Sequence, residues 1–239
     1  MTGRETGDRA AFLAPARDRL AGDIFTNPVH VPPPAPAPGA PAPLPRYGNL
    51  DPDDLVTTFA DAVAHAEATC HVVAGDVPDD LLDALVGELA GRPAVVSAEP
   101  MAQAVGARLA ARGVEVADST PERAAAAGLG VTGAVAAVAA TGSIVLDSRA
   151  AGGRTTSLLP AVHLCVVDVN VLVPTPADVL RRLGSGSDAL PPSLVLVTGP
   201  SRTGDIEQLL TLGAHGPTAL HVVLVTGAGR ASSISVSPD

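Results

Sequence analysis

The stretch TGPSRTGDIE, residues 198–207, gathers side chains suited to binding a small acid. An apolar run before it predicts a strand over 194–198, and the segment after it predicts a helix over 204–213. A glycine-rich turn entering a helix exposes backbone N–H groups beside the positive end of the helix dipole, where anions bind. The candidate ligand-binding residues of this turn are Gly199, Pro200, Ser201, Arg202, Thr203 and Asp205.

The same turn also has a purely structural interpretation. Thr203 or Asp205 would cap the helix, and Glu207 would complete an acidic first turn. The spacing favours neither interpretation. The absence of lysine excludes a Walker A phosphate loop, and the glycines do not form the GxGxxG pattern of a dinucleotide site.

A second group of polar residues lies in the middle of the chain. Thr141, Gly142 and Ser143 form the predicted tip of a hairpin, and Arg154 lies in the glycine-rich loop that follows. These four are further candidate ligand-binding residues, because hydroxyl and guanidinium groups bind carboxylates and phosphates. Ordinary turn chemistry is the favoured interpretation of this group from its sequence alone.

Among the histidines, His215 is the candidate catalytic residue. It follows the C-terminus of the predicted helix, where it would be partly exposed, and imidazole titrates near neutral pH. His163 and His221 fall in predicted strands, where we expect structural roles with satisfied hydrogen bonds. No histidine or cysteine has metal-ligand spacing, so no metal site is predicted.

The composition excludes several classes of function. All fifteen basic residues are arginine, which rules out Schiff-base and pyridoxal phosphate lysines. A net charge of −10 and the absence of aromatic residues after Phe59 argue against nucleic-acid binding. Two cysteines without a CxxC pair cannot supply the four thiolates of an iron–sulfur cluster. We therefore expect no cofactor in this chain.

From Asp51 onward, strand-like and helix-like runs alternate, as is typical of βαβ units. Helices are predicted from Asp51 and from Thr175, and over 79–90, 101–112 and 204–213; strands are predicted over 70–74, 93–98, 114–117, 162–169, 194–198 and 220–225. An antiparallel hairpin of 131–139 and 143–147 interrupts the rhythm. The prediction is an α/β fold with an open, mixed, mostly parallel sheet and helices on both faces.

The chain divides into two regions by composition. Residues 1–49 are predicted as an N-terminal helix over 5–21 followed by a proline-rich extension over 28–45, and residues 50–239 as the α/β domain. The sequence has no signal-peptide core and no uninterrupted apolar segment of membrane-spanning length. With two cysteines in apolar runs, these features predict a cytoplasmic protein without a membrane span.

Four runs, over 141–146, 157–163, 198–207 and 213–217, resemble in this order the motifs of the LUD-domain family, and within it the lactate utilization protein C (LutC/YkgG) group. The resemblance covers roughly residues 50–225. It implies a fold like the NagB/RpiA/CoA-transferase group and a role in oxidising L-lactate to pyruvate beside iron–sulfur partner proteins. In one departure, Ala140 stands where family members often carry an acidic residue.

Two functions follow from these observations. The first is an accessory or small-acid-binding subunit of an L-lactate oxidation system, with a small carboxylate as ligand and the iron–sulfur clusters in its partners. The alternative is an independent enzyme of the CoA-transferase/isomerase-like fold that acts on a small carboxylated or phosphorylated metabolite. The sequence leaves open whether this chain is an enzyme, although the absence of lysine and the alanine at position 140 weaken the alternative.

Overall fold

The structure is a computed structural model, and it describes residues 52–149, 153–184, 191–204, 210–212, 216–227 and 234–236. The predicted N-terminal helix and proline-rich extension lie outside these residues, and so do Asp205 and His215. None of the described helices is both long and apolar enough to cross a membrane.

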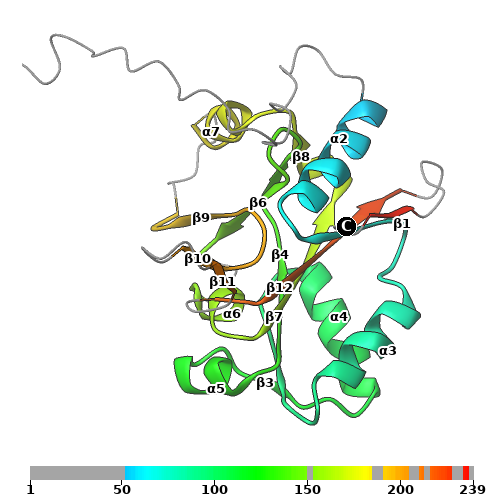
Figure 1. Cartoon of the computed structure of the whole chain (residues 1–239), viewed down its shortest axis with the longest axis vertical. Coiled ribbons are helices and arrows are strands. Elements are labelled where there is room, and N and C mark those ends of the chain that lie inside the picture. The colour runs from blue at the N-terminus through cyan, green and yellow to red at the C-terminus, as the bar shows by residue number, and fades with distance from the viewer. Residues whose placement is uncertain are drawn as a thin grey trace, which may run out of the picture. The chain divides into compact units, whose positions relative to one another are not determined.

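A seven-stranded sheet forms the centre of the domain (Figure 1), in the order β13-β1-β12-β7-β4-β2-β3. Neighbouring strands are parallel except β13, which pairs antiparallel with β1 at one edge. The strands are β1 (Thr69–Ala74), β2 (Ala94–Val96), β3 (Val116–Ala117), β4 (Leu129–Gly133), β7 (Val162–Asp168), β12 (Ala219–Thr226) and β13 (Ile234–Val236). The predicted open, mixed, mostly parallel sheet is confirmed.

A second, four-stranded sheet has the order β8-β5-β6-β9. Its strands are β5 (Ala136–Val138), β6 (Ser143–Asp147), β8 (Leu172–Val173) and β9 (Leu194–Val197). β5 and β6 form the predicted hairpin, but its first arm was predicted too long: residues 129–133 belong to β4 of the main sheet. Every residue of both segments is buried, so the apolar run carries no alternation to mark the break.

Helices α3 (Asp79–Glu88) and α4 (Pro100–Ala111) cover one face of the main sheet. Their buried residues Leu82 and Leu109 belong to one apolar cluster with Leu129 of β4 and Leu164 of β7. Ion pairs from Arg112 to acidic residues of α3 join the two helices at their exposed sides.

The opposite face of the main sheet packs against α2 (Pro52–His65) and the second sheet. Phe59 of α2, Ile144 of β6 and Val222 of β12 share this second apolar cluster. The far side of the second sheet packs against α7 (Pro176–Gly184), whose Val179 is buried there. Two short helices were not predicted, namely α5 (Pro121–Ala126) and α6 (Thr155–Leu158), and a 3-10 turn spans Val169–Val171.

The prediction of a helix over 204–213 is wrong for the residues of that segment that the structure describes. Strand β10 (Arg202–Gly204) pairs antiparallel with β11 (Leu210–Leu212), so both described ends of that segment are strands. Glycine and threonine, which occur at Gly204, Thr203 and Thr211, have low helix propensity and agree with an extended backbone at these ends. The preceding strand β9 also lies in the second sheet, antiparallel to β6, and not in the main sheet.

Candidate functional site

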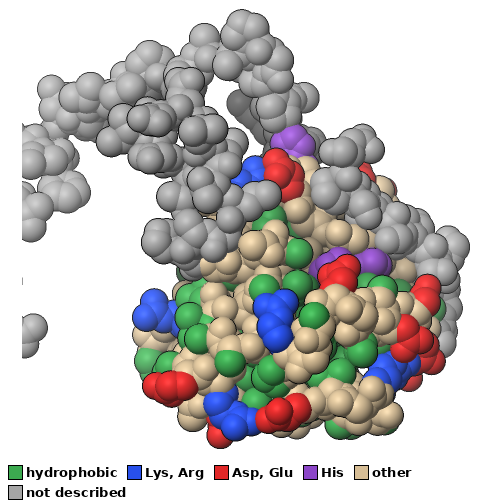
Figure 2. Space-filling view, turned by 60° about the horizontal axis from the view of Figure 1, so that its bottom comes forward, with side chains coloured by type: hydrophobic (Ala, Val, Ile, Leu, Met, Phe, Trp, Pro, Cys, Tyr) green, Lys and Arg blue, Asp and Glu red, His purple; other side chains and the backbone are tan. Residues whose placement is uncertain are grey.

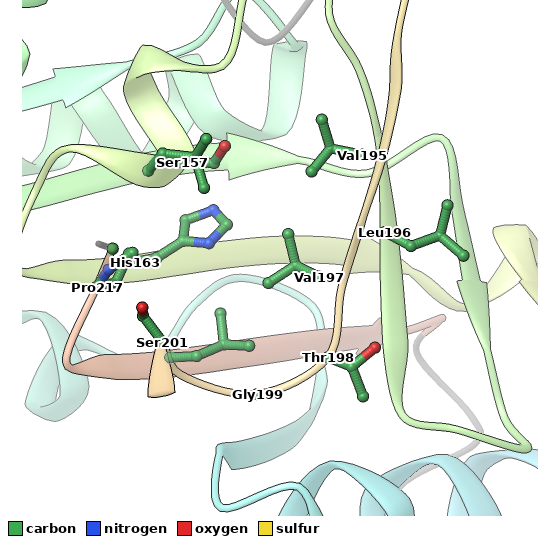
Figure 3. A pocket seen from close by; sticks show the side chains of 12 residues that line it. Ser157, His163, Val195, Leu196, Val197, Thr198, Gly199, Ser201 and Pro217 are labelled. Atoms are coloured by element: carbon green, nitrogen blue, oxygen red, sulfur yellow. The ribbon is translucent and has the colours of Figure 1, made fainter. Parts of the chain in front are cut away.

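A cavity of about 240 Å³ lies between the main sheet, α6 and β9 (Figure 3). We call it the His163 cavity. The main sheet contributes His163 and Leu220; α6 contributes Ser157 and Leu158; β9 and the turn after it contribute Val195, Leu196, Val197, Thr198, Gly199 and Ser201; and Gly216 and Pro217 complete the lining. None of these side chains carries a fixed charge, and Leu196, which is 52% exposed, is the most open of the apolar ones.

The cavity lies at the amino ends of the central strands. His163 is the second residue of β7, and it pairs across the sheet with Leu220 of β12 on one side and Gly130 of β4 on the other. In most open α/β sheets ligands bind at the carboxyl ends instead. Here α6 and β9 lie beside the amino ends and line the cavity together with them (Figure 3).

His163 is the one titratable side chain among the described lining residues, and it is 1% exposed. Its Nε2 lies 2.9 Å from the hydroxyl of Thr132, whereas its Nδ1 has no hydrogen-bond partner among the described residues. The ring lies between Ser157 and Ser201 in Figure 3. Burial lowers the pKa of His163 to about 4, so the imidazole is neutral at pH 7.

A buried nitrogen without a partner is costly, because a polar group loses its hydration on burial. Native proteins leave few such atoms, and those that remain often have a functional explanation. Nδ1 of His163 is therefore the atom in this cavity most suited to receive a hydrogen bond from, or donate one to, a bound molecule.

The close approach of α6 to the sheet depends on Gly130. A Cβ at this position would lie 1.9 Å from the backbone oxygen of Thr156, a distance that no side chain could accommodate. Glycine in a strand often marks such an approach of another backbone segment. The missing side chain at 130 thus allows Ser157 and Leu158 to form a wall of the cavity.

The turn at 198–201 does line a cavity, as predicted, although it does not open a helix. Thr198, Gly199 and Ser201 are lining residues, and the Ser201 N–H donates to the oxygen of Pro217 at 2.8 Å. Gly199 has φ +80°, and a Cβ there would lie 2.2 Å from the oxygen of Ala66, so this glycine packs the turn against the end of α2.

Arg202 is not brought to the cavity. Its guanidinium pairs with Glu67 at 2.7 Å and donates to the backbone oxygen of Ala66 at 3.3 Å. This places a cation at the C-terminal end of α2, where it complements the helix dipole. Pro200 is not a lining residue either, and the side chain of Thr203 lies outside the described atoms.

The predicted hairpin residues 141–143 contact the turn at 198–201 and do not line the cavity themselves. The hydroxyl of Ser143 lies 2.6 Å from those of Thr141 and Thr198, which forms a chain of three hydroxyl groups between β6 and the end of β9. Gly142 has φ +65°, and a Cβ there would lie 2.5 Å from the nitrogen of Val63. Of these residues only Thr198 lines the cavity.

Two further expectations concern Arg154 and Ala140. Arg154 is exposed at the start of α6 and does not line the cavity.

Ala140 is 6% exposed and packs in the apolar cluster with Val145 of β6 and Val179 of α7. A carboxylate at position 140 would therefore enter that apolar cluster, and the alanine removes no group from the described lining of the His163 cavity.

A second cavity of the same volume lies near the carboxyl ends of β1 and β12. Asp76 and Arg108 are its charged lining residues, but Arg108 donates to the oxygen of Val77 at 2.5 Å and to Asp79 at 2.6 Å. This arginine is therefore already engaged in joining α4 to the start of α3. None of its described lining residues has a buried atom without a hydrogen-bond partner, unlike His163 in the first cavity.

The described residues contain no group of three or more His, Cys, Asp or Glu side chains that could hold a metal ion. Both cysteines are buried and free, and burial raises the pKa of Cys70 and of Cys165 to about 12. These thiols stay protonated at physiological pH, unlike reactive or metal-binding thiolates.

A family model described as the LUD domain matches residues 80–225. The chain belongs to the LUD-domain family. Lactate utilization protein C of Halalkalibacterium halodurans is 35% identical to this LUD domain over 120 residues, which cover 47% of the chain and 52% of the relative. The protein of the same name from Bacillus licheniformis is 35% identical over 112 residues, covering 45% and 46%.

The LUD domain spans about half the length of these two relatives. A longer alignment joins it to lactate utilization protein C of Bacillus subtilis, at 26% identity over 201 residues, or 76% of the chain and 84% of the relative. A crystal structure of a DUF162 family protein from Deinococcus radiodurans matches with a TM-score of 0.56 at 23% identity, covering 74% of this chain and all of that one. This likeness supports the fold of the LUD domain.

Sequence reasoning missed the central residue of this site. His163 was expected to be a satisfied structural histidine, and its alternation with Cys165 on one strand face agrees with the buried face that the structure shows. Only the three-dimensional arrangement shows that Nδ1 has no partner. The predicted catalytic residue His215 lies outside the described residues, so its role stays a prediction.

Proposed function

We propose that this LUD domain takes part in lactate utilization and binds a small organic acid in the His163 cavity. The lactate utilization names of its relatives support the process. The observation that carries the binding site is the unpartnered Nδ1 of a fully buried histidine beside an empty space. Together they favour a ligand with one polar end and a small apolar remainder.

The size of the cavity supports a small metabolite. About 240 Å³ is below the range of roughly 300–1,000 Å³ typical of pockets for drug-sized ligands. A hydroxy acid of a few heavy atoms fits such a volume, whereas a nucleotide or an intact coenzyme A does not. Five of the twelve lining residues are valine or leucine and suit a methyl group, while Ser201 and His163 offer polar contacts.

In this proposal the domain is an accessory subunit, and iron–sulfur partner proteins carry out electron transfer. The low reactivity expected of its two buried cysteines supports a division of labour in which this chain supplies no cluster ligands. A cytoplasmic location belongs to the same proposal. Figure 2 shows acidic and basic side chains interspersed among apolar ones on this face of the described surface.

A second candidate function is an independent enzyme that acts on a small carboxylated metabolite. The observation in its favour is also His163, since a neutral imidazole near a bound substrate can accept a proton. The two functions differ in turnover: a binding subunit retains its ligand unchanged, whereas an enzyme converts it without added partners.

Binding is tested by calorimetric titration of the purified chain with L-lactate, pyruvate and acetate. We expect saturable one-to-one binding of at least one of these acids. The variant Ser201→Leu extends an apolar side chain from the rim and should weaken binding at least tenfold. Ser119→Leu, at a half-buried serine that does not line the cavity, is the matched control and should bind like the wild type.

The absence of binding by all three acids would contradict the proposed function, as would equal weakening by both serine variants. Affinity purification from the native host, with iron and sulfide analysis of the co-purified proteins, tests the accessory role. Recovery of the chain without iron–sulfur proteins, together with turnover of the bound acid by the chain alone, would favour the enzyme instead.

A further inference from the structure

We propose that the His163 cavity takes up one proton with each small monocarboxylic acid that it binds, forming an imidazolium–carboxylate pair at His163. This inference rests on the proposed function, because it concerns the ionic state of the same site. It adds a property that the family relationship does not supply: acid and proton bind together, and the affinity therefore depends on pH.

The described lining of the His163 cavity offers no ready counter-charge for a carboxylate. None of the described lining side chains carries a fixed positive charge. Arg202 pairs with Glu67 at the end of α2, and Arg154 is exposed on the far end of α6. A carboxylate that left water for this cavity without a counter-charge would lose its hydration at a high cost in free energy.

His163 is placed to supply the missing positive charge. Among the described lining residues it alone can acquire a positive charge, and its Nδ1 is buried without a partner. A proton taken from solvent makes both ring nitrogens donors. Nδ1–H then donates to the ligand carboxylate, and Nε2–H donates to the Thr132 hydroxyl 2.9 Å away.

Thr132 fits both ionic states of the ring. A hydroxyl group can donate to a neutral Nε2 or accept from a protonated one, so the contact with Thr132 survives protonation. With a carbonyl at this position Nε2 would have to carry a proton in both states, whereas the hydroxyl also allows the neutral ring to carry its proton on Nδ1. The hydroxyl group thus lets His163 change its charge without breaking its internal hydrogen bond.

The other titratable groups around His163 cannot replace it. Cys165 follows on the same strand face, but its pKa of about 12 keeps it neutral. Val162, Leu220 and Gly130 surround His163 along and across the sheet and do not titrate. His215 lies outside the described residues, two positions before the lining residue Pro217, and is therefore included in the test.

The expected pH dependence follows from linkage. In the empty cavity burial keeps the pKa of His163 near 4, and a carboxylate beside the ring raises it. Between these two pKa values each ligand brings one proton, so the affinity rises about tenfold for each unit by which the pH falls. Above the pKa of the complex the affinity becomes independent of pH.

The experiment is isothermal titration of the full chain with L-lactate from pH 8 to pH 5, in buffers of different ionisation enthalpy. We expect uptake approaching one proton per ligand and tighter binding toward pH 5. The neutral analogue L-lactamide should bind without proton uptake. His163→Gln keeps a polar side chain at this position and should remove the proton uptake, while His215→Gln should retain it.

Each outcome is decisive. Lactate binding without proton uptake even at pH 5 would overturn the inference and leave the proposed function in place. Uptake that persists in His163→Gln or disappears in His215→Gln would also overturn it, because the proton would then reside elsewhere. If lactate, pyruvate and acetate all fail to bind the wild type, the proposed function itself fails.

Discussion

The free energy of unfolding should fall between pH 7.5 and pH 4.5 by an amount that the burial of His163 sets. The pKa of this side chain is lowered from 6.5 to about 4 by burial, so the folded state holds the ring neutral. A histidine whose folded pKa is depressed contributes stability above its unfolded pKa, and that contribution is lost as the pH falls from 6.5 toward 4.

The magnitude follows from these two values. At pH 4.5, protonation of His163 in the unfolded chain lowers the free energy of unfolding by about 2.5 kcal/mol. At pH 7.5 the same effect lowers it by about 0.1 kcal/mol. Because the ring is fully buried, little solvent screening reduces the difference. With a urea m-value of about 2 kcal/mol/M, the midpoint should shift by roughly 1 M on this account alone.

Urea unfolding of the wild type and of His163→Gln at both pH values isolates this contribution, because all other groups titrate in both proteins. The wild type should lose about 2.5 kcal/mol more than the variant on acidification. His65→Gln, at an exposed histidine near the end of α2, is the control and should follow the wild type. Equal losses in the wild type and His163→Gln would refute the assignment of a buried neutral imidazole.

Other substitutions test the architecture around the cavity. Gly130→Ala brings a Cβ within 1.9 Å of the α6 backbone and should lower the free energy of unfolding by roughly 3 kcal/mol. Gly87→Ala, at an exposed helical site with open space, should raise the free energy of unfolding by about 0.5–1 kcal/mol. Urea unfolding measures both changes. Thr198→Val removes a hydroxyl bonded to the buried Ser143 and should cost about 1 kcal/mol in the same assay. Arg202→Ala removes an ion pair outside the cavity, so lactate affinity measured by calorimetry should change less than twofold; a loss of tenfold or more would restore this arginine to the site.

Most of the fold could be predicted because its elements are locally encoded. Alternating apolar strands and amphipathic helices indicated the parallel units of β1, β2, β3, β7 and β12 with α3 and α4. The strand predicted over 194–198 is present as β9 (Leu194–Val197), but it belongs to the second sheet and not to the main sheet. Membership in one of two sheets depends on pairing between distant segments, which apolar patterning does not specify.

The site could be predicted only in part. The turn of Gly199 and Ser201 was identified by its composition and lines the cavity, whereas Arg202 was chosen for its charge and instead pairs with Glu67. His163 was passed over because the pattern of a buried strand does not distinguish a satisfied nitrogen from an unpartnered one. Nδ1 of His163 is without a partner because α6 and β9 leave a cavity beside the imidazole ring.

The most direct measurement of the central claim is a crystal structure of this chain with L-lactate bound, determined near pH 5.5. We expect the ligand carboxylate within hydrogen-bonding distance of Nδ1 of His163, with its methyl group toward Val195 and Val197. Lactate bound beside Asp76 and Arg108 in the second cavity, with the His163 cavity unoccupied, would contradict a binding site at His163.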